Sequence, residues 1–188
     1  SVLPTDLEGA TISNQKADMK TALVMSADDV YVSMYGTKFG DFARFNSAGF
    51  HWNGSAWSVF KLGDNFAGHF EKAGDGTAYT AAGKKIYKYD GESWTEINVS
   101  GITNNGSDDF SWIDVVGCSG NTLYVVNIVE RTLDGYYAID LGSGAATKVF
   151  TDAEVQGCVP VNQYTNAPLA SFLGADFNGN LYATSSKG

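Results

Sequence analysis

The sequence predicts an all-β protein built from repeated units of four short strands. The chain of 188 residues has 22 glycines but only three prolines, a composition typical of short strands joined by tight turns. It is 44% hydrophobic and 13% aromatic, which suits one folded core. The strongest observation is internal repetition, because two hairpin-like segments match each other and a tyrosine-centred strand recurs along the chain.

The hairpin repeat is "FHWNGSAWSVF", residues 50–60, followed by "YKYDGESWTEI", residues 87–97. Aligning Trp57 with Trp94 places Asn-Gly on Asp-Gly and the preceding aromatic residues on each other. Each copy reads as a strand, an Asx-Gly turn and a second strand, the pattern of a β-hairpin. A third copy, "GYYAIDLGSG", places Asp140 at the turn position.

The second repeated element is a single strand, found in "DDVYVSM", "GTAYTAA", "NTLYVVN" and "GNLYATS". These copies are centred on Tyr31, Tyr79, Tyr124 and Tyr182. The spacing predicts units at about 22–65, 66–105, 108–152 and 168–188, and the last holds only two strands. Together they form one repeat domain, 22–188. Residues 1–21 form an N-terminal segment in which "ATIS" could supply one closing strand.

The repeated units resemble the blades of bacterial β-propellers of the kelch, NHL and two-component-regulator kind. The phrases "DFNGNLYAT" and "YKYDGESW" carry the resemblance, which covers residues 22–188. It implies a β-propeller-like fold with three four-stranded blades and the start of a fourth. Because propellers close with about 4–8 blades, we expect the rest from a larger propeller or from neighbouring subunits. A stacked open sheet is the alternative.

The phrase "YDGESW" also resembles the Asp box of sialidase-like propellers, with differences. Asp90 lies four residues before Trp94 where the box has five, and the serine of the box is absent. A sialidase site needs three arginines to bind a carboxylate, and this chain has only Arg44 and Arg131. We therefore predict no sialidase activity within these residues.

The charge balance argues against several classes of partner. The formal net charge is −9, with no cluster of lysine or arginine, so nucleic acid and anionic lipid would be repelled. The sequence also contains no apolar run long enough to cross a bilayer, and we predict no membrane insertion. Few lysines and abundant Gly, Ser, Thr and Asn favour an extracellular or cell-surface location, with the periplasm as an alternative.

The two cysteines leave two interpretations open. Cys118 and Cys158 lack the spacing and neighbouring histidines of a zinc site. They are either separate reduced thiols or a disulfide, which would close a loop of about 40 residues and stabilise the fold by roughly 3–4 kcal/mol. A disulfide would place the protein outside the reducing cytosol.

The tryptophans are either sugar-stacking platforms or core residues. Their repetition at fixed positions favours packing for Trp52, Trp57 and Trp94. Trp112 has weaker repeat support and is a candidate for ligand binding. Tyr164, in a long loop, and Asn53, in a hairpin turn, are the other candidates.

The residues for catalysis and metal binding are sparse. The histidines are His51 and His69, and no serine stands in a nucleophile elbow, so we predict no catalytic residues. The paired acids 28–29 and 108–109 are interpreted as solvated turn residues. The one candidate cofactor is calcium, at a loop whose twelfth position holds a lysine instead of the required glutamate. The same loop also reads as a plain hairpin turn. Its candidate ligands are Asp176, Asn178 and Asn180.

These observations predict a non-catalytic, secreted or cell-surface module that binds protein or glycan or takes part in assembly. We expect its function in the loops that vary between units, at 36–44, 103–109 and 152–168. Two alternatives stay open. The chain could be part of a carbohydrate-active propeller enzyme whose catalytic residues lie elsewhere, or a structural subunit of an extracellular filament or shell.

Overall fold

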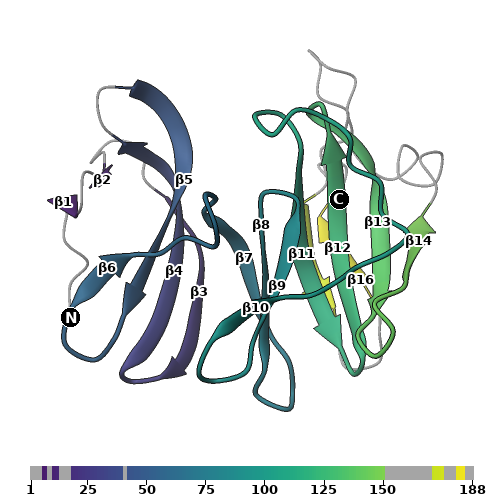
Figure 1. The fold of residues 1–188 in the computed structure, drawn as a ribbon, viewed down its shortest axis with the longest axis horizontal. Coiled ribbons are helices and arrows are strands. Elements are labelled where there is room, and N and C mark those ends of the chain that lie inside the picture. Colours follow the sequence, from purple (N-terminus) through teal and green to yellow (C-terminus); the bar gives the residue numbers. More distant parts are fainter. Residues whose placement is uncertain are drawn as a thin grey trace.

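The computed structural model shows an all-β chain in which four antiparallel sheets stand side by side (Figure 1). It describes the backbone of residues 6–7, 10–12, 18–39, 42–150, 171–175 and 181–184, and the side chains of 21–34 and 48–149. No helix occurs in these ranges. The all-β prediction is therefore confirmed.

Sheet 1 contains six strands, and sheets 2 and 3 contain four each. In sheet 1, β3 pairs with β4 and the remaining order is β1-β2-β4-β5-β6. Sheet 1 consists of β1 (Asp6–Leu7), β2 (Ala10–Ile12), β3 (Asp18–Ser26), β4 (Asp29–Phe39), β5 (Phe42–Trp52) and β6 (Trp57–Val59). Sheet 2 consists of β7 (Ala67–Lys72), β8 (Ala78–Ala82), β9 (Lys85–Tyr89) and β10 (Trp94–Glu96).

Sheet 3 consists of β11 (Trp112–Ser119), β12 (Thr122–Val129), β13 (Thr132–Asp140) and β14 (Ala146–Phe150), and sheet 4 of β15 (Ser171–Ala175) and β16 (Leu181–Thr184). Sheets 2, 3 and 4 are simple meanders, with each strand paired to the next. The four strands predicted for each of the second and third units are thus confirmed. The first strands also contact one another in order, β3 with β7, β7 with β11 and β11 with β15.

The predicted Asx turns connect β5 to β6 in sheet 1, β9 to β10 in sheet 2 and β13 to β14 in sheet 3. Asn53 Oδ1 accepts hydrogen bonds from the backbone N–H of Ser55 and Ala56, at 3.1 and 2.9 Å. Asp90 Oδ1 accepts from the N–H of Glu92 and Ser93, both at 2.9 Å, and Asp140 Oδ1 accepts from Ser143. Gly54 and Gly91 have φ near +90° and +102°, a conformation that favours glycine.

The sheets pack face to face, and equivalent repeat positions occupy equivalent faces. Tyr31 of sheet 1 packs in the cluster shared with sheet 2, and Tyr79 of sheet 2 packs in the cluster shared with sheet 3. On the opposite faces, Tyr89 faces back toward sheet 1 and Ile139 faces back toward sheet 2. Positions that match in the sequence repeat therefore have matching packing positions in the structure.

The two inter-sheet clusters differ in their side chains. The first is mainly aromatic, and the ring centroids of Tyr31 and Trp94 are 5.5 Å apart. Its other aromatic residues are Phe60, Phe70, Tyr87 and Tyr89. The second is mainly aliphatic, with Val115, Leu123, Val125 and Ile139 fully buried, and it also contains Tyr79 and Tyr137. Apolar residues of the segment after β10, including Val99 and Ile102, also pack into this second cluster.

The predicted loop at 36–44 is instead mostly strand. β4 continues to Phe39 and β5 begins at Phe42, so the insertion of the first unit extends a β-hairpin, with its backbone paired as Phe39 to Phe42. The predicted "ATIS" strand exists as β2, and it pairs with this extension at Ala10 and Phe39. Extended β-hairpins satisfy their own backbone groups, which explains why the insertion forms strand.

Candidate ligand pocket

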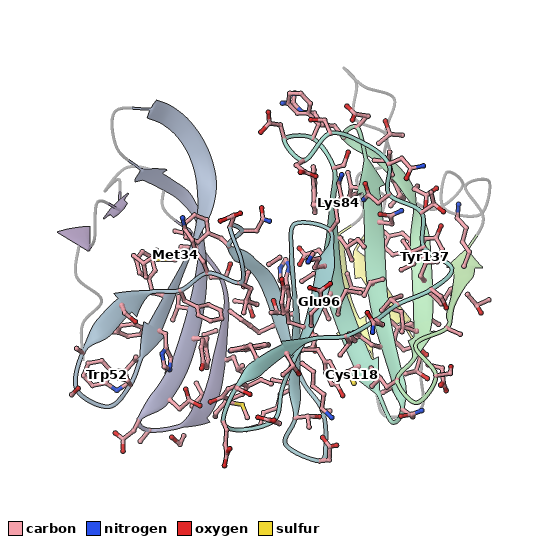
Figure 2. The ribbon with its side chains drawn as sticks, viewed as in Figure 1. Met34, Trp52, Lys84, Glu96, Cys118 and Tyr137 are labelled. Carbon is pink, nitrogen blue, oxygen red and sulfur yellow. The ribbon has the colours of Figure 1, made fainter. Side chains whose placement is uncertain are left out.

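A cavity with a volume of about 450 Å³ lies between sheets 2 and 3. Its walls are the β8–β9 turn, the strands β9 and β10, the first residues of β11 and the segment 97–105. In Figure 2, Lys84 of the β8–β9 turn lies at the upper end of the sheets, and Trp52 lies at the opposite end. The cavity falls within the usual size of small-molecule sites, roughly 300–1,000 Å³.

The pocket exists because segment 97–105 crosses from sheet 2 to sheet 3 and pairs with the edge of β14. Ser100 N–H donates to Gly144 O at 2.9 Å, and Ala146 N–H donates to Ser100 O at 2.8 Å. A Cβ on Gly101 would lie 2.5 Å from Ala146 O, so only glycine permits this close approach. The backbone of the segment is thus fixed against sheet 3.

A small residue, Ala146, lies beside the docked segment. In sheets 1 and 2 the last strand, β6 or β10, pairs a tryptophan with the last aromatic residue of the preceding strand, as Trp94 pairs with Tyr89. In sheet 3 the same register places Ala146 opposite Ile139. Because alanine leaves the volume that an indole fills in the other sheets, the apolar side chains of segment 97–105 can enter there.

The pocket has an aliphatic floor and a polar rim. The floor is formed by Ile86, Ile97, Val99, Ile102 and Ile113, and the polar lining by Lys84, Lys85, Glu96, Asn98, Thr103, Asn104 and Asn105. The rim residues Asn98, Thr103 and Asn105 are exposed, whereas Ile86 and Ile113 are buried. Polar residues outnumber aliphatic ones in the lining, seven to five, so the pocket has a mixed surface.

Both lysines of the lining have carboxylate partners. Lys84 Nζ lies 2.7 Å from Asp108 Oδ1 and also donates to Gly106 O. Lys85 Nζ lies 2.7 Å from Glu96 Oε2, and this hydrogen bond raises the pKa of Lys85. The positive charges at the pocket are therefore matched within the protein.

A chain of side-chain hydrogen bonds fixes the pocket wall on the side of sheet 3. Asn127, fully buried, donates through Nδ2 to Asp134 Oδ2 and to Thr103 O, both at 3.0 Å. Asn104 Nδ2 then donates to Asn127 Oδ1 at 2.7 Å and to Ile128 O at 3.0 Å. Because Asp134 can only accept when ionised, the orientation of both amides is determined. The Oδ1 of Asn104 is left buried without a hydrogen-bond partner among the described residues.

Trp112 and Asn53 are not in the pocket, and the structure does not bring them together. Trp112 opens β11 and is 40% exposed, but residues alternate along a strand, so it lies on the face opposite its neighbour Ile113. Asn53 is exposed in the β5–β6 turn, at the other end of the sheets, where its Oδ1 stabilises the turn. Trp52, read as a packing residue, is half-buried against Trp57, with ring centroids 5.7 Å apart.

The other predicted site residues lie outside the described residues. These are Tyr164, the calcium candidates Asp176, Asn178 and Asn180, and Cys158. Cys118 is a half-buried free thiol in β11, and burial raises its pKa to about 11. Its pairing with Cys158 stays a prediction. Among the described residues, no group of three His, Cys, Asp or Glu side chains is arranged to hold a metal ion.

Both histidines are paired with carboxylates that the sequence did not indicate as their partners. His69 Nδ1 lies 2.8 Å from Asp114 Oδ2, and the N–H of His69 donates to Asp114 Oδ1 at 2.8 Å. Since Asp114 satisfies an edge N–H of β7 as well as the ring, this pair joins sheets 2 and 3. No sequence signal could have found a partner 45 residues away.

The reading of Asp29 as a solvated turn residue is wrong. Its Oδ1 lies 2.8 Å from His51 Nε2, and its Oδ2 accepts a hydrogen bond of 2.7 Å from Tyr89 OH. The ring of His51 also stacks on Tyr31 at 4.2 Å. Asp29 therefore links sheet 1 to sheet 2, a role determined by the approach of the two sheets.

Comparisons with known proteins do not identify the chain. No protein-family model matches the sequence, and neither a curated protein nor a solved structure matches it. Across the ranges that the structure describes, there is no helix of the length and apolarity needed to cross a bilayer. The pocket and the loops around it therefore carry the functional argument.

Proposed function

We propose that this chain is a β-propeller segment that acts as a non-catalytic binding module and takes its ligand in the pocket between sheets 2 and 3. The propeller arrangement is supported by the successive contacts of β3, β7, β11 and β15, and by the repeated face-to-face packing of four-stranded meanders. Further blades, from a longer chain or from neighbouring subunits, would complete the ring. The acidic composition favours a secreted or cell-surface location.

The observation that carries the binding function is the position of the pocket. The pocket borders the variable segment 103–109, whose Asp108 pairs with Lys84. The turns at Asn53 and Asp90 are short and of one kind, and neither residue lines the pocket. A rigid scaffold with loops that vary at one end is a common way to present a binding site.

The test is retention of the labelled chain on arrays of glycans and of peptides. We expect retention by at least one ligand class, and we expect Asn98→Trp, which places an indole at the pocket rim, to abolish it. The matched control is Glu92→Trp, an equally exposed position in the β9–β10 turn that does not line the pocket, which should leave retention unchanged. Retention that survives Asn98→Trp, or absence of any retention, would overturn the proposal.

A further inference from the structure

We propose that the outer face of sheet 1, the face turned away from sheet 2, docks a second copy of this chain. The proposal rests on the propeller arrangement of the proposed function, since it names the subunit that supplies the further sheets. Three observations lead to it: an apolar row across sheet 1, the covering of the equivalent row in sheet 2, and a matching strand at the far end of the chain.

The apolar row crosses the outer face of sheet 1 with one residue from each of four strands. The register pairs Val24 with Val30, and Val30 with Trp52. Trp52 in turn pairs with Trp57. Val30 and Trp57 pack in a cluster with Phe50 that is separate from the cluster between sheets 1 and 2. Val24 is 58% exposed and the rest of the row is half-buried, which is typical of an interaction surface.

The equivalent row in sheet 2 is covered by a neighbouring sheet. There Tyr89 pairs with Trp94, and Tyr89 is only 5% exposed. The ring centroid of Tyr31, from sheet 1, lies 5.5 Å from the ring centroids of both residues. Trp52 and Trp57 hold the same two positions in sheet 1. The same packing on sheet 1 requires a preceding sheet that presents an aromatic residue in the position of Tyr31.

The chain itself contains a sheet with an aromatic residue at that repeat position. The sequence repeat matches Tyr182, in β16 of sheet 4, with Tyr31 and Tyr79. Tyr31 and Tyr79 each pack in the cluster shared with the following sheet. The contacts of the first strands place sheet 1 and sheet 4 at the two ends of the stack (Figure 1). Sheet 4 of a second copy therefore matches what the outer face of sheet 1 requires.

The contact between sheet 1 of one copy and sheet 4 of another joins two different surfaces. Such heterologous contacts either close into a ring or build an open filament. Each chain has four sheets, so a closed pair has eight, and propellers close with about 4–8 blades. The number of sheets thus favours a closed pair of chains over a filament.

The experiment is sedimentation velocity of the 188-residue chain over a range of micromolar concentrations. We expect a single species with twice the mass of one chain. Trp52→Glu places an unpaired carboxylate in the contact and should raise the dissociation constant by at least about a hundredfold. Tyr182→Ala should raise it by about tenfold or more. The matched control is Thr95→Glu, which adds the same charge at an exposed position of sheet 2 and should leave the pair unchanged.

A mixture of the two variant chains tests whether the contact is heterologous. When a Trp52→Glu chain meets a Tyr182→Ala chain, one of the two contacts keeps both native residues. The mixture should therefore form pairs at concentrations at which each variant alone is monomeric. A monomeric wild-type chain, species that keep growing with concentration, or a Tyr182→Ala chain that pairs as tightly as the wild type would overturn the proposal. If Trp52→Glu does not fold, the wild-type chain and Tyr182→Ala still decide the question.

The outcomes separate the pairing of chains from the function of the pocket. If the chain is monomeric and Asn98→Trp still abolishes retention on the arrays, the pairing is wrong while the pocket keeps its role. If the chain pairs as expected and no array retains it, the pairing is supported and the role of the pocket is wrong.

Discussion

The two interfaces between sheets use the same repeat positions and differ in what fills their outer side. Between sheets 1 and 2, the rings of Phe60, Phe70 and Trp94 are in mutual contact, with centroids 5.9–6.4 Å apart. Between sheets 2 and 3, aliphatic side chains and the segment 97–105 occupy the corresponding volume, and a pocket remains. A filled interface and an interface with a pocket thus arise from one architecture.

The difference shows how a repeat protein can create a site by losing one large side chain. Trp57 and Trp94 pair with the last aromatic residue of the preceding strand, whereas Ala146 occupies this register in sheet 3. The missing indole admits a backbone segment, and that segment brings its own polar side chains to the surface. The polar groups that the segment brings, among them Asn98, Thr103 and Asn105, therefore accompany a packing change, and the predictions below test this contrast.

The largest loss of stability is expected from a substitution in the aromatic interface between sheets 1 and 2. Phe70→Ala removes a buried ring that contacts Tyr31 and Trp94, and should lower the free energy of unfolding by about 3–5 kcal/mol. Urea denaturation measures this value. Glu92→Ala, at an exposed turn of the same sheet, should change it by less than about 0.5 kcal/mol. A Phe70→Ala loss as small as that of the control would mean that the ring does not support the interface.

The next effect concerns the polar wall of the pocket. Asn127→Ala removes the hydrogen bonds that join Asn127 to Asn104, to the carbonyl of Thr103 and to the carboxylate of Asp134, and should cost about 1–3 kcal/mol. Asn121→Ala, which removes one exposed hydrogen bond of 3.2 Å, is the control and should cost less than about 0.5 kcal/mol. Equal urea midpoints for the two variants would contradict the role of Asn127.

Restoring the missing indole should close the pocket. Ala146→Trp should expel segment 97–105 from β14, destabilise the fold by about 1–3 kcal/mol and abolish ligand binding. Hydrogen exchange at the Ser100 and Ala146 amides should then become fast. Thr147→Trp, at the adjacent exposed position, should leave both amides protected. Continued protection in Ala146→Trp would show that alanine is not what admits the segment.

The smallest effect is expected in the acid sensitivity of the Asx turns that the repeated units share. Hydrogen bonds from Ser93 and Glu92 hold the pKa of Asp90 below its usual value. A lowered pKa gives stability that is present above the unfolded value, about 3.9, and is lost as the pH falls through the folded value. The urea midpoint of Asp90→Asn should therefore equal that of the wild-type chain at pH 7. On acidification to pH 3, the midpoint of the variant should fall less than that of the wild-type chain. The reverse change, Asn53→Asp, should make the midpoint more sensitive to acid.

The repeated units could be predicted because their signals are local. An Asx residue followed by glycine between alternating aromatics defines each hairpin, and the turns at Asn53, Asp90 and Asp140 form as expected. The candidate loop 103–109 also lies beside the pocket. The extended β4–β5 hairpin was missed because the insertion lacks a simple alternating pattern.

The pocket itself could not be predicted, because it depends on register and on contacts between distant residues. Ala146 lies six residues after Asp140, whereas Trp94 lies four after Asp90, so the longer turn conceals their equivalence. Asn104 and Asn127 are 23 residues apart, and neither stands in a recognisable motif. Trp112 was favoured because it is aromatic and outside the repeat, but its face of β11 is the wrong one for the pocket.

The claim that the gap between sheets 2 and 3 is the ligand site is tested most directly by nuclear magnetic resonance of the isoleucine methyl groups during titration with the ligand retained on the arrays. Isoleucines occur both in the pocket, at Ile86, Ile97, Ile102 and Ile113, and outside it, at Ile128 and Ile139. Shifts concentrated on the pocket isoleucines are the predicted result. Shifts confined to Ile128 and Ile139, or a titration that moves no isoleucine methyl, would contradict the account.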